Sequence, residues 1–211
     1  MQYIKQAFLL FVFFTLIGCT TQFRSSIEHN VHILKKDKLK EYGMSFITPT
    51  TITGMEQDKQ YLALTFSHEL KKLRPELTIG DLSTALGLIN QTDLAEDYKK
   101  MYDDYAATGI FNKKILKKIG VITKNRYLCQ LILGHFESKA QGRLGLLGLS
   151  ITDTESANLR LFVQVWDSQA GIIVWEAAQE LNFAYDTMDE KPVTFEQMIK
   201  FAANDVAKVL P

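Results

Sequence analysis

The chain has 211 residues, and 46% of them are hydrophobic, a share that supports a folded core and differs from the composition of disordered chains. It carries 24 Lys and Arg residues against 24 Asp and Glu residues, so it lacks the basic excess that nucleic-acid binding needs. We therefore expect one globular domain, with or without a tether, that binds no nucleic acid.

The N-terminus predicts a signal peptide over residues 1–18. Lys5 precedes an apolar stretch, residues 7–17, which is about half as long as the ~20-residue helix that crosses a bilayer. The run Leu-Ile-Gly-Cys closes this segment at Cys19 and resembles the lipobox of bacterial lipoproteins. An ordinary cleaved signal with a chance cysteine at position 19 is the alternative.

The lipobox resemblance implies that Cys19 receives a diacylglyceryl thioether and, after cleavage before it, becomes the acylated N-terminus. Two or more acyl chains hold a protein stably at a bilayer. In enteric-type bacteria an Asp after this cysteine favours retention in the inner membrane, and here the residue is Thr20. By this resemblance we expect a lipid-anchored protein on the periplasmic face of the outer membrane.

Residues 19–43 predict a tether between the anchor and the domain, because they are mostly polar and charged. A flexible chain of about 24 residues spans roughly 27 Å, enough to hold a domain clear of a membrane surface. The alternative is a basic patch that contacts anionic lipid through Lys35, Lys36, Lys38 and Lys40.

Residues 44–211 predict a single domain, which begins with short strands and several helices. The helix expected over residues 94–107 has a core-facing stripe at spacings of three and four, formed by Leu94, Tyr98, Met101, Tyr102 and Tyr105. The other elements expected in this half are strands at 44–49 and 76–80 and helices at 57–73, 82–88 and 113–119.

The second half predicts strands joined by turns. Apolar residues alternate with other residues along the strand expected at 159–166, as in a sheet with one face in the core. Further strands are expected at 127–136, 144–152 and 172–183, and an amphipathic helix at about 194–210. We therefore predict an α/β (α+β) fold: a mixed, largely antiparallel sheet with helices packed on it and an amphipathic C-terminal helix.

Motifs for catalysis, metals and cofactors are missing from the sequence. His68-Glu69 begins like a zinc-protease helix, but Lys72 stands at the second histidine position. Ser150 lacks the second glycine of a nucleophile elbow, and no phosphate-binding glycine loop occurs. We expect a protein without enzymatic activity, metal or cofactor. A hydrolase with an unrecognised site that uses His135 is the alternative.

Two segments are candidates for partner binding. Residues 142–148 hold three glycines at a spacing of three, which favours a bulged or mobile hairpin. The sharper interpretation is an apolar loop that contacts a partner or a membrane through Leu144, Leu146 and Leu147. Trp166 and Trp175 flank a hairpin turn that Gly171 closes; they predict either a packed cross-strand pair or an exposed recognition patch.

The order of elements in the second half resembles that of a group of periplasmic lipoprotein domains. A strand at residues 127–134 follows a helix that ends near Gly120, and the later segment LFVQVWDSQAGIIVW spans residues 161–175. These features are similar to the curli-secretion lipoprotein domain, the penicillin-binding-protein activator lipoproteins and the N-terminal domain of the translocation protein TolB. The resemblance implies an α/β sandwich that binds proteins and not small substrates.

Together these features predict a lipid-anchored accessory or scaffold protein of a cell-envelope complex. Its expected partners are the lipid bilayer, through acylated Cys19, and an envelope protein, with an oligomer as a further possibility. The alternative is an oligomeric outer-membrane secretion or channel component of the curli-secretion lipoprotein type.

Overall fold

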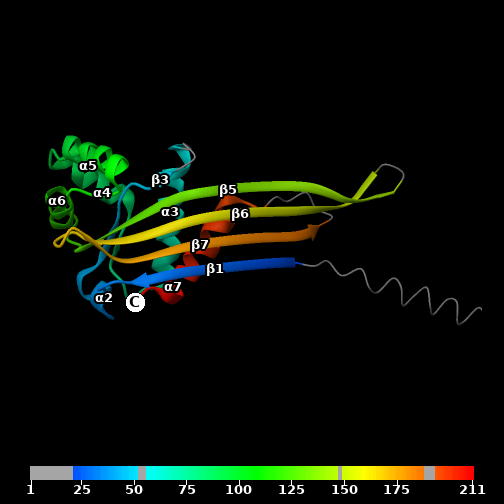
Figure 1. The fold of residues 1–211 in the computed structure, drawn as a ribbon, viewed down its shortest axis with the longest axis horizontal. Helices are drawn as coiled ribbons and strands as arrows, with labels where there is room; N and C mark the ends of the chain where they lie inside the picture. Colours follow the sequence, from blue (N-terminus) through cyan, green and yellow to red (C-terminus); the bar gives the residue numbers. More distant parts are fainter. Residues whose placement is uncertain (1–20, 52–55, 147–148, 188–192) are drawn as a thin grey trace, which may run out of the picture.

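The computed structural model describes residues 21–51, 56–146, 149–187 and 193–211. A seven-stranded mixed sheet forms its body (Figure 1). The strands follow one another across the sheet in the order β1 (Thr21–Val31), β7 (Ile172–Thr187), β6 (Leu149–Asp167), β5 (Tyr127–Leu146), β2 (Met44–Phe46) and β4 (Ile79–Gly80), and β3 (Thr50–Thr51) also pairs with β5.

The four long strands are antiparallel, and the three short strands add parallel pairs on the β5 side. The described helices are α2 (Lys38–Tyr42), α3 (Glu56–Leu73), α4 (Leu82–Gln91), α5 (Ala95–Thr108), α6 (Lys113–Thr123) and α7 (Phe195–Val209). The predicted class, a mixed and largely antiparallel sheet with a C-terminal amphipathic helix, is confirmed. None of the described helices combines the length and the apolar character needed to cross a membrane.

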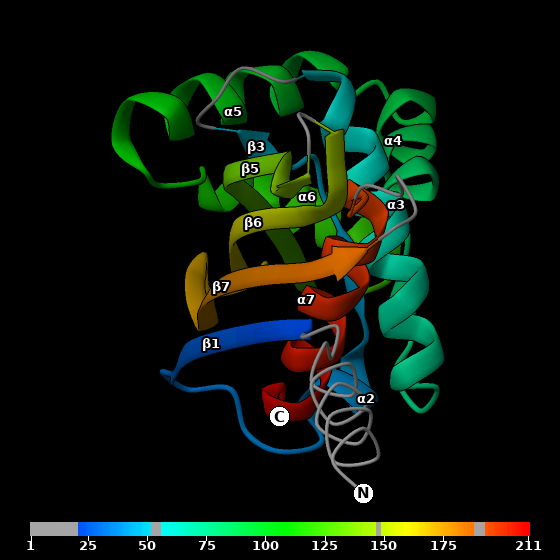
Figure 2. The ribbon, with the colours of Figure 1, turned by 90° about the vertical axis from the view of Figure 1, so that its right-hand side faces the viewer.

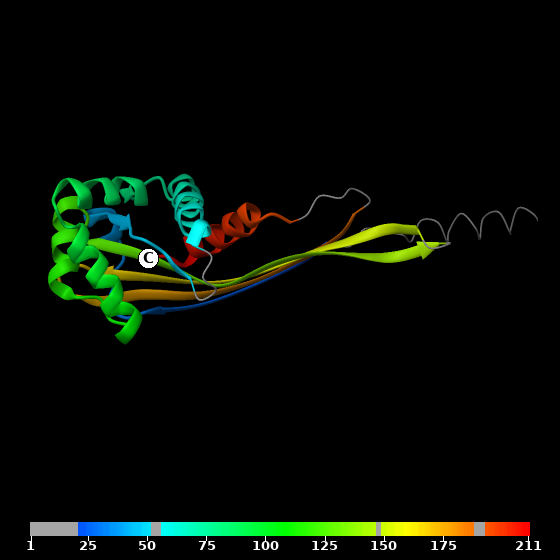
Figure 3. The same ribbon diagram turned by 90° about the horizontal axis from the view of Figure 1, so that it is seen from above.

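The helices divide between the two faces of the sheet. Figure 3 shows α3 and α7 together on one face, while α5 and α6 gather at the end where β6 turns into β7. The larger core lies under α3 and α7 and includes Phe66, Trp175 and Met198. A second core lies under α5 and α6 and includes Phe111 and Trp166.

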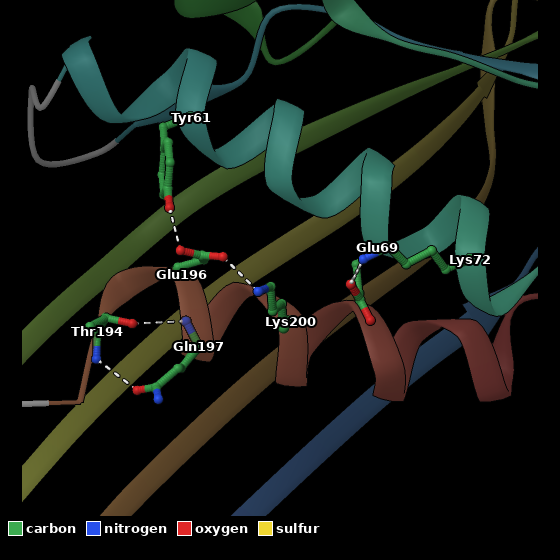
Figure 4. Close-up of polar contacts among 7 residues, drawn as sticks. All are labelled: Tyr61, Glu69, Lys72, Thr194, Glu196, Gln197 and Lys200. Carbon is green, nitrogen blue, oxygen red and sulfur yellow. Dashed lines mark hydrogen bonds and ion pairs between the residues drawn. The ribbon is translucent and has the colours of Figure 1, made fainter.

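Helices α3 and α7 are joined by polar contacts at their exposed seam (Figure 4). The Tyr61 hydroxyl donates to Glu196 at 3.0 Å, and the ammonium group of Lys200 lies 2.6 Å from the same carboxylate. At the start of α7, Thr194 and Gln197 form a capping box, each side chain accepting from the other's backbone N–H. Such a box satisfies two N–H groups that the first turn of a helix leaves free.

Residues 21–31 correct the expected tether. They form β1, which pairs with β7 along its whole length, from Thr21 opposite Tyr185 to Val31 opposite Trp175. The Phe23 ring lies 5.9 Å from that of Phe183 and 5.0 Å from that of Phe201, on the α7 side of the sheet. The stretch has a polar composition because only one of its faces packs against a helix, not because it is free in solvent.

The hairpin of β5 and β6 is longer than the sequence predicts. Twenty and 19 residues form its two strands, so it is roughly 65 Å long at ~3.3 Å per residue. Its far half extends past all the helices (Figures 1 and 3). Register shifts between Leu133 and His135 and at residues 142–145 mark bulges, which confirms the bulged hairpin expected around the three glycines.

Candidate interaction surface

One face of the four long strands carries no helix beyond the α5–α6 end. In the end-on view of Figure 2, α3, α4 and α7 lie on one side of β6, β7 and β1, and the other side of β7 and β1 is free of described helices. We call the side chains on this free side the open face. Because side chains alternate along a strand, the register between the strands decides which residues share it.

The register aligns the open face in five rows that run from β5 across β6 and β7 to β1. They are Gln130, Gln164, Glu176 and Asn30; Ile132, Phe162, Ala178 and Glu28; His135, Arg160, Glu180 and Ser26; Glu137, Asn158, Asn182 and Arg24; and Lys139, Ser156, Ala184 and Gln22. The bulge between Leu133 and His135 preserves this alignment beyond the second row. Because of the bulge, Leu133 and Phe136 both face the α7 side, and His135 lies on the open face.

An ion pair divides the open face in the middle. Arg160 of β6 and Glu180 of β7 lie 3.0 Å apart, and the Arg160 guanidinium group sits 5.6 Å from the centre of the Phe162 ring. Both charged side chains are more than half exposed, so the pair adds little to stability. It does fix an aromatic ring and a cation side by side at the centre of the surface.

The surface is hollowed on each side of this ion pair. One hollow of about 260 Å³ lies over the small residue Ala178 and is bordered by Phe162, Gln164, Glu28 and Glu176. The other, of about 660 Å³, lies toward the far end and is bordered by amide and hydroxyl side chains together with Arg24. The near hollow is therefore acidic and partly apolar, and the far one is polar and positively charged at one edge.

The tyrosine stripe of α5 closes the near end of the open face as part of the core, as the sequence predicts. The Tyr98 hydroxyl donates to the Thr48 hydroxyl at 2.9 Å, and that of Tyr102 donates to the Thr48 carbonyl at 2.5 Å. Burial raises the pKa of both phenols. Tyr105 donates to Gln164 at 3.4 Å, which links this cluster to the near hollow.

Trp166 and Trp175 do not form the recognition patch or the cross-strand pair that the sequence suggests. Their exposed fractions are 3% and 0%, so neither ring is available to a partner. Trp175 pairs with Val165, and a register shift follows before Trp166. The two rings consequently lie in different cores on opposite faces of the sheet.

The remaining predicted site residues do not lie among the five rows of the open face. Cys19 and Leu147 lie outside the described residues. Leu144 and Leu146 lie in the far part of β5, opposite Thr152 and Leu149. Cys129 is buried, and burial raises the pKa of its thiol, as expected of an inert cysteine. Within the described ranges, no three His, Cys, Asp or Glu side chains gather as a metal site would require.

The open face itself was missed at the sequence level. Its sequence signal is the alternation of Arg24, Ser26 and Glu28 with Phe23 and Ile27, which fits a half-buried strand. That signal is weak because the apolar positions are few and the stretch follows the polar residues after Cys19.

No protein-family model matches this chain, and no curated protein matches it. Among solved structures, a PelC dodecamer from Paraburkholderia phytofirmans is similar with a TM-score of 0.45 and 10% identity, over 89% of this chain and 95% of that one. The lipoprotein GNA1162 from Neisseria meningitidis has a TM-score of 0.38 and 12% identity, over 78% and 97% of the two chains.

Proposed function

We propose that this chain is a lipid-anchored protein of the cell envelope that has no enzymatic activity and holds a protein partner on its open face. The observation that carries this proposal is the set of five aligned rows across four strands. Tyr105 of α5 contacts the first row at Gln164, and the other four rows have no helix over them in the described part of the chain. The anchor rests on the lipobox-like run that ends at Cys19, and Thr20, in place of an Asp after that cysteine, favours the outer membrane as the location.

The arrangement of residue types on the open face supports protein binding. The row of Ile132, Phe162 and Ala178 is apolar and partly exposed, and rows of polar and charged side chains flank it. Protein interfaces share this organisation, with an apolar centre and a polar rim. Aromatic and Arg side chains supply most of the binding energy at such centres, and Phe162 with Arg160 provides both.

The size of the open face limits what it can do alone. Four strands at ~4.8 Å spacing and nine residues at ~3.3 Å each give a patch of roughly 19 by 30 Å, or about 570 Å². A stable interface buries about 800 Å² on each partner. A partner held only by the open face would bind weakly, and a stable complex would need the hairpin or a sheet edge as well.

Purification from crosslinked membranes tests the proposal. The full chain carrying Phe162→Glu should lose a co-purifying envelope protein, because a carboxylate replaces the apolar centre beside Arg160. The matched control is Lys99→Glu, an exposed substitution on α5 away from the open face. Recovery of the same partner with both variants, each checked for folding by circular dichroism, would overturn the proposal.

A second function has one observation in its favour. The far half of the β5–β6 hairpin extends beyond the helices, and Leu144, Leu146 and Leu149 lie in this part of it. An oligomeric secretion component would use such a hairpin to contact neighbouring subunits or a membrane. In that case Leu144→Asp would abolish partner recovery while Phe162→Glu would not.

A further inference from the structure

Strand β1 forms an outer edge of the sheet, and in the described part of the chain no strand pairs with its free side. Natural proteins protect such edges with short strands, Pro, Lys or bulges, because unpaired backbone groups recruit other strands. β1 is 11 residues long, contains neither Pro nor Lys, and runs without a register shift. It is therefore a long and regular edge, and of the devices that protect edges it has only charged side chains, those of Arg24 and Glu28.

Two opposite charges stand on this edge. Arg24 and Glu28 are both exposed and both lie on the open face. They are four residues apart, or about 13 Å along the strand at ~3.3 Å per residue, which is too far for them to pair with each other. Neither has an ion-pair partner among the described residues. Ser26 lies midway between them.

We propose that β1 pairs in antiparallel register with β1 of a second copy, about a two-fold axis through Ser26. Arg24 of each copy then lies opposite Glu28 of the other, so two ion pairs form, and Gln22 lies opposite Asn30. Opposite charges in directly facing positions stabilise antiparallel strands. A two-fold interface of this kind is self-complementary. This inference does not depend on the proposed function.

The charges select this register among its neighbours. Moving the axis by one residue places Arg24 opposite either Ser26 or Asn30 of the second copy, and no ion pair forms. Moving it by half a residue would place even-numbered opposite odd-numbered positions, whose side chains lie on opposite faces, and directly opposite residues of antiparallel strands share a face. Only the axis at Ser26 pairs both charges and keeps the open faces of the two copies on the same side.

Apolar contacts on the other face fit the same register. Phe23 packs against Phe183 and Phe201 but keeps 47% of its surface exposed. In the proposed pair it lies opposite the second copy's His29, so two aromatic rings meet across the strands. Val31, with an exposed fraction of 51%, lies opposite the second copy's Thr21.

The pairing also doubles the open face. Two sets of long strands join into one continuous sheet, so the roughly 570 Å² patch becomes about 1,100 Å². That area exceeds the ~800 Å² per partner of a standard interface. An extended segment of another protein would also satisfy the free edge, but the symmetric placement of Arg24 and Glu28 about Ser26 favours a second copy.

Charge reversal tests the register directly. We would measure the mass of the full chain, purified from membranes in detergent, by light scattering across a range of concentrations. Arg24→Glu and Glu28→Arg should each raise the dimer dissociation constant about 10- to 30-fold, because two attractive pairs become repulsive. The double variant should restore dimers, and Lys99→Glu should not change them. A monomeric wild type, or a folded double variant without rescue, would overturn the proposal.

Cysteine crosslinking tests the axis independently. Ser26→Cys should form a disulfide-linked dimer under mild oxidation, since directly opposite Cβ atoms lie about 4.5–5.5 Å apart. Gln22→Cys should not, because its two copies would be about 26 Å apart at ~3.3 Å per residue. The wild type, which retains Cys19 and Cys129, is the control. Equal crosslinking by both variants, or a Ser26→Cys disulfide to a different protein, would contradict the proposal.

Discussion

The side chains of Arg126 and Asp167 lie 2.7 Å apart and join the start of β5 to the turn between β6 and β7. The Asp167 carboxylate is almost fully buried and also accepts from the backbone N–H groups of Gln169 and Ala170, at 2.9 and 3.2 Å. This one carboxylate therefore organises the turn end of the hairpin that carries half of the open face.

Asp167→Asn should destabilise the fold by about 1–3 kcal/mol, the usual range for a buried hydrogen bond to a charged group. The amide removes the charge and exchanges one acceptor oxygen for a donor. The partly exposed Arg126 can be solvated in the variant, which keeps the loss below that of a fully buried ion pair. Urea unfolding monitored by circular dichroism measures the effect. Unchanged stability would show that the carboxylate does not hold the turn.

The same residue should contribute to acid sensitivity. Burial acts to raise the pKa of Asp167, but hydrogen bonds from Arg126 and two backbone N–H groups outweigh it, and the pKa is lowered. The stabilisation by the ionised Asp167 carboxylate is fully present above about pH 3.9, the pKa of an Asp in the unfolded chain. It is lost as pH falls through the lower pKa that Asp167 has in the folded protein. Unfolding free energies between pH 6 and 3 should fall less steeply for Asp167→Asn. Parallel curves would contradict this linkage.

Gly171 in the same turn should not tolerate a side chain. Its φ is +73°, and an added Cβ would lie 2.7 Å from Cβ of Lys113. Gly171→Ala should lower the melting temperature, with a cost of about 1–3 kcal/mol for the left-handed backbone and the close contact. Gly87 in α4 is the matched control, since a Cβ there meets nothing within 4 Å. Gly87→Ala should stabilise by about 0.4–1 kcal/mol.

Phe23 distinguishes a strand from a tether. Because the ring packs on Phe183 and Phe201 and is about half buried, Phe23→Ala should cost about 1–2 kcal/mol. Gln22→Ala, on the open face of the same strand, should change stability by less than about 0.5 kcal/mol. Thermal unfolding at one fixed protein concentration compares the two. Equal and negligible effects would show that residues 21–31 behave as a solvated tether.

The N-cap of α7 offers a test of the layer that covers the larger core. Thr194→Ala should remove the side-chain half of the capping box and cost about 1 kcal/mol. Thr194→Ser keeps the accepting hydroxyl and should retain most of the stability. Chemical denaturation measures the free energy of unfolding of the two variants. An equal loss of stability in both would point to the methyl group of Thr194 rather than to the cap.

The sequence predicted elements whose residues contact their own neighbours in the chain. Asp81 and Asn112 accept from backbone N–H groups at the starts of α4 and α6, and Gly109 ends α5 with a φ of 72°. Each is a local signal within one turn of a helix. Three of the four strands expected in the second half correspond to β5, β6 and β7. The strand expected at 144–152 was wrong, since its described residues belong to the end of β5 and the start of β6, which pair with each other.

Features that depend on distant partners were not predictable from the sequence. Residues 21–31 appear polar until β7, about 150 positions later, provides their hydrogen bonds. The contrasting environments of Trp166 and Trp175 depend on one register shift between Val165 and Trp166. The open face was not predictable for the same reason, because its rows form only when four strands are aligned with one another. A single sequence specifies the alternation within a strand but not the alignment between strands.

The most direct test of the account is site-specific photocrosslinking in intact cells. A benzoylphenylalanine at Asn182, which is exposed on the open face, should capture a defined envelope protein. The same group at Lys99 on α5 should not. The mass of the mature N-terminus, compared with that of Cys19→Ser, would establish the anchor in the same samples. Capture at Asn182 alone is the predicted result, and equal capture or none at both positions would contradict a binding role for the open face.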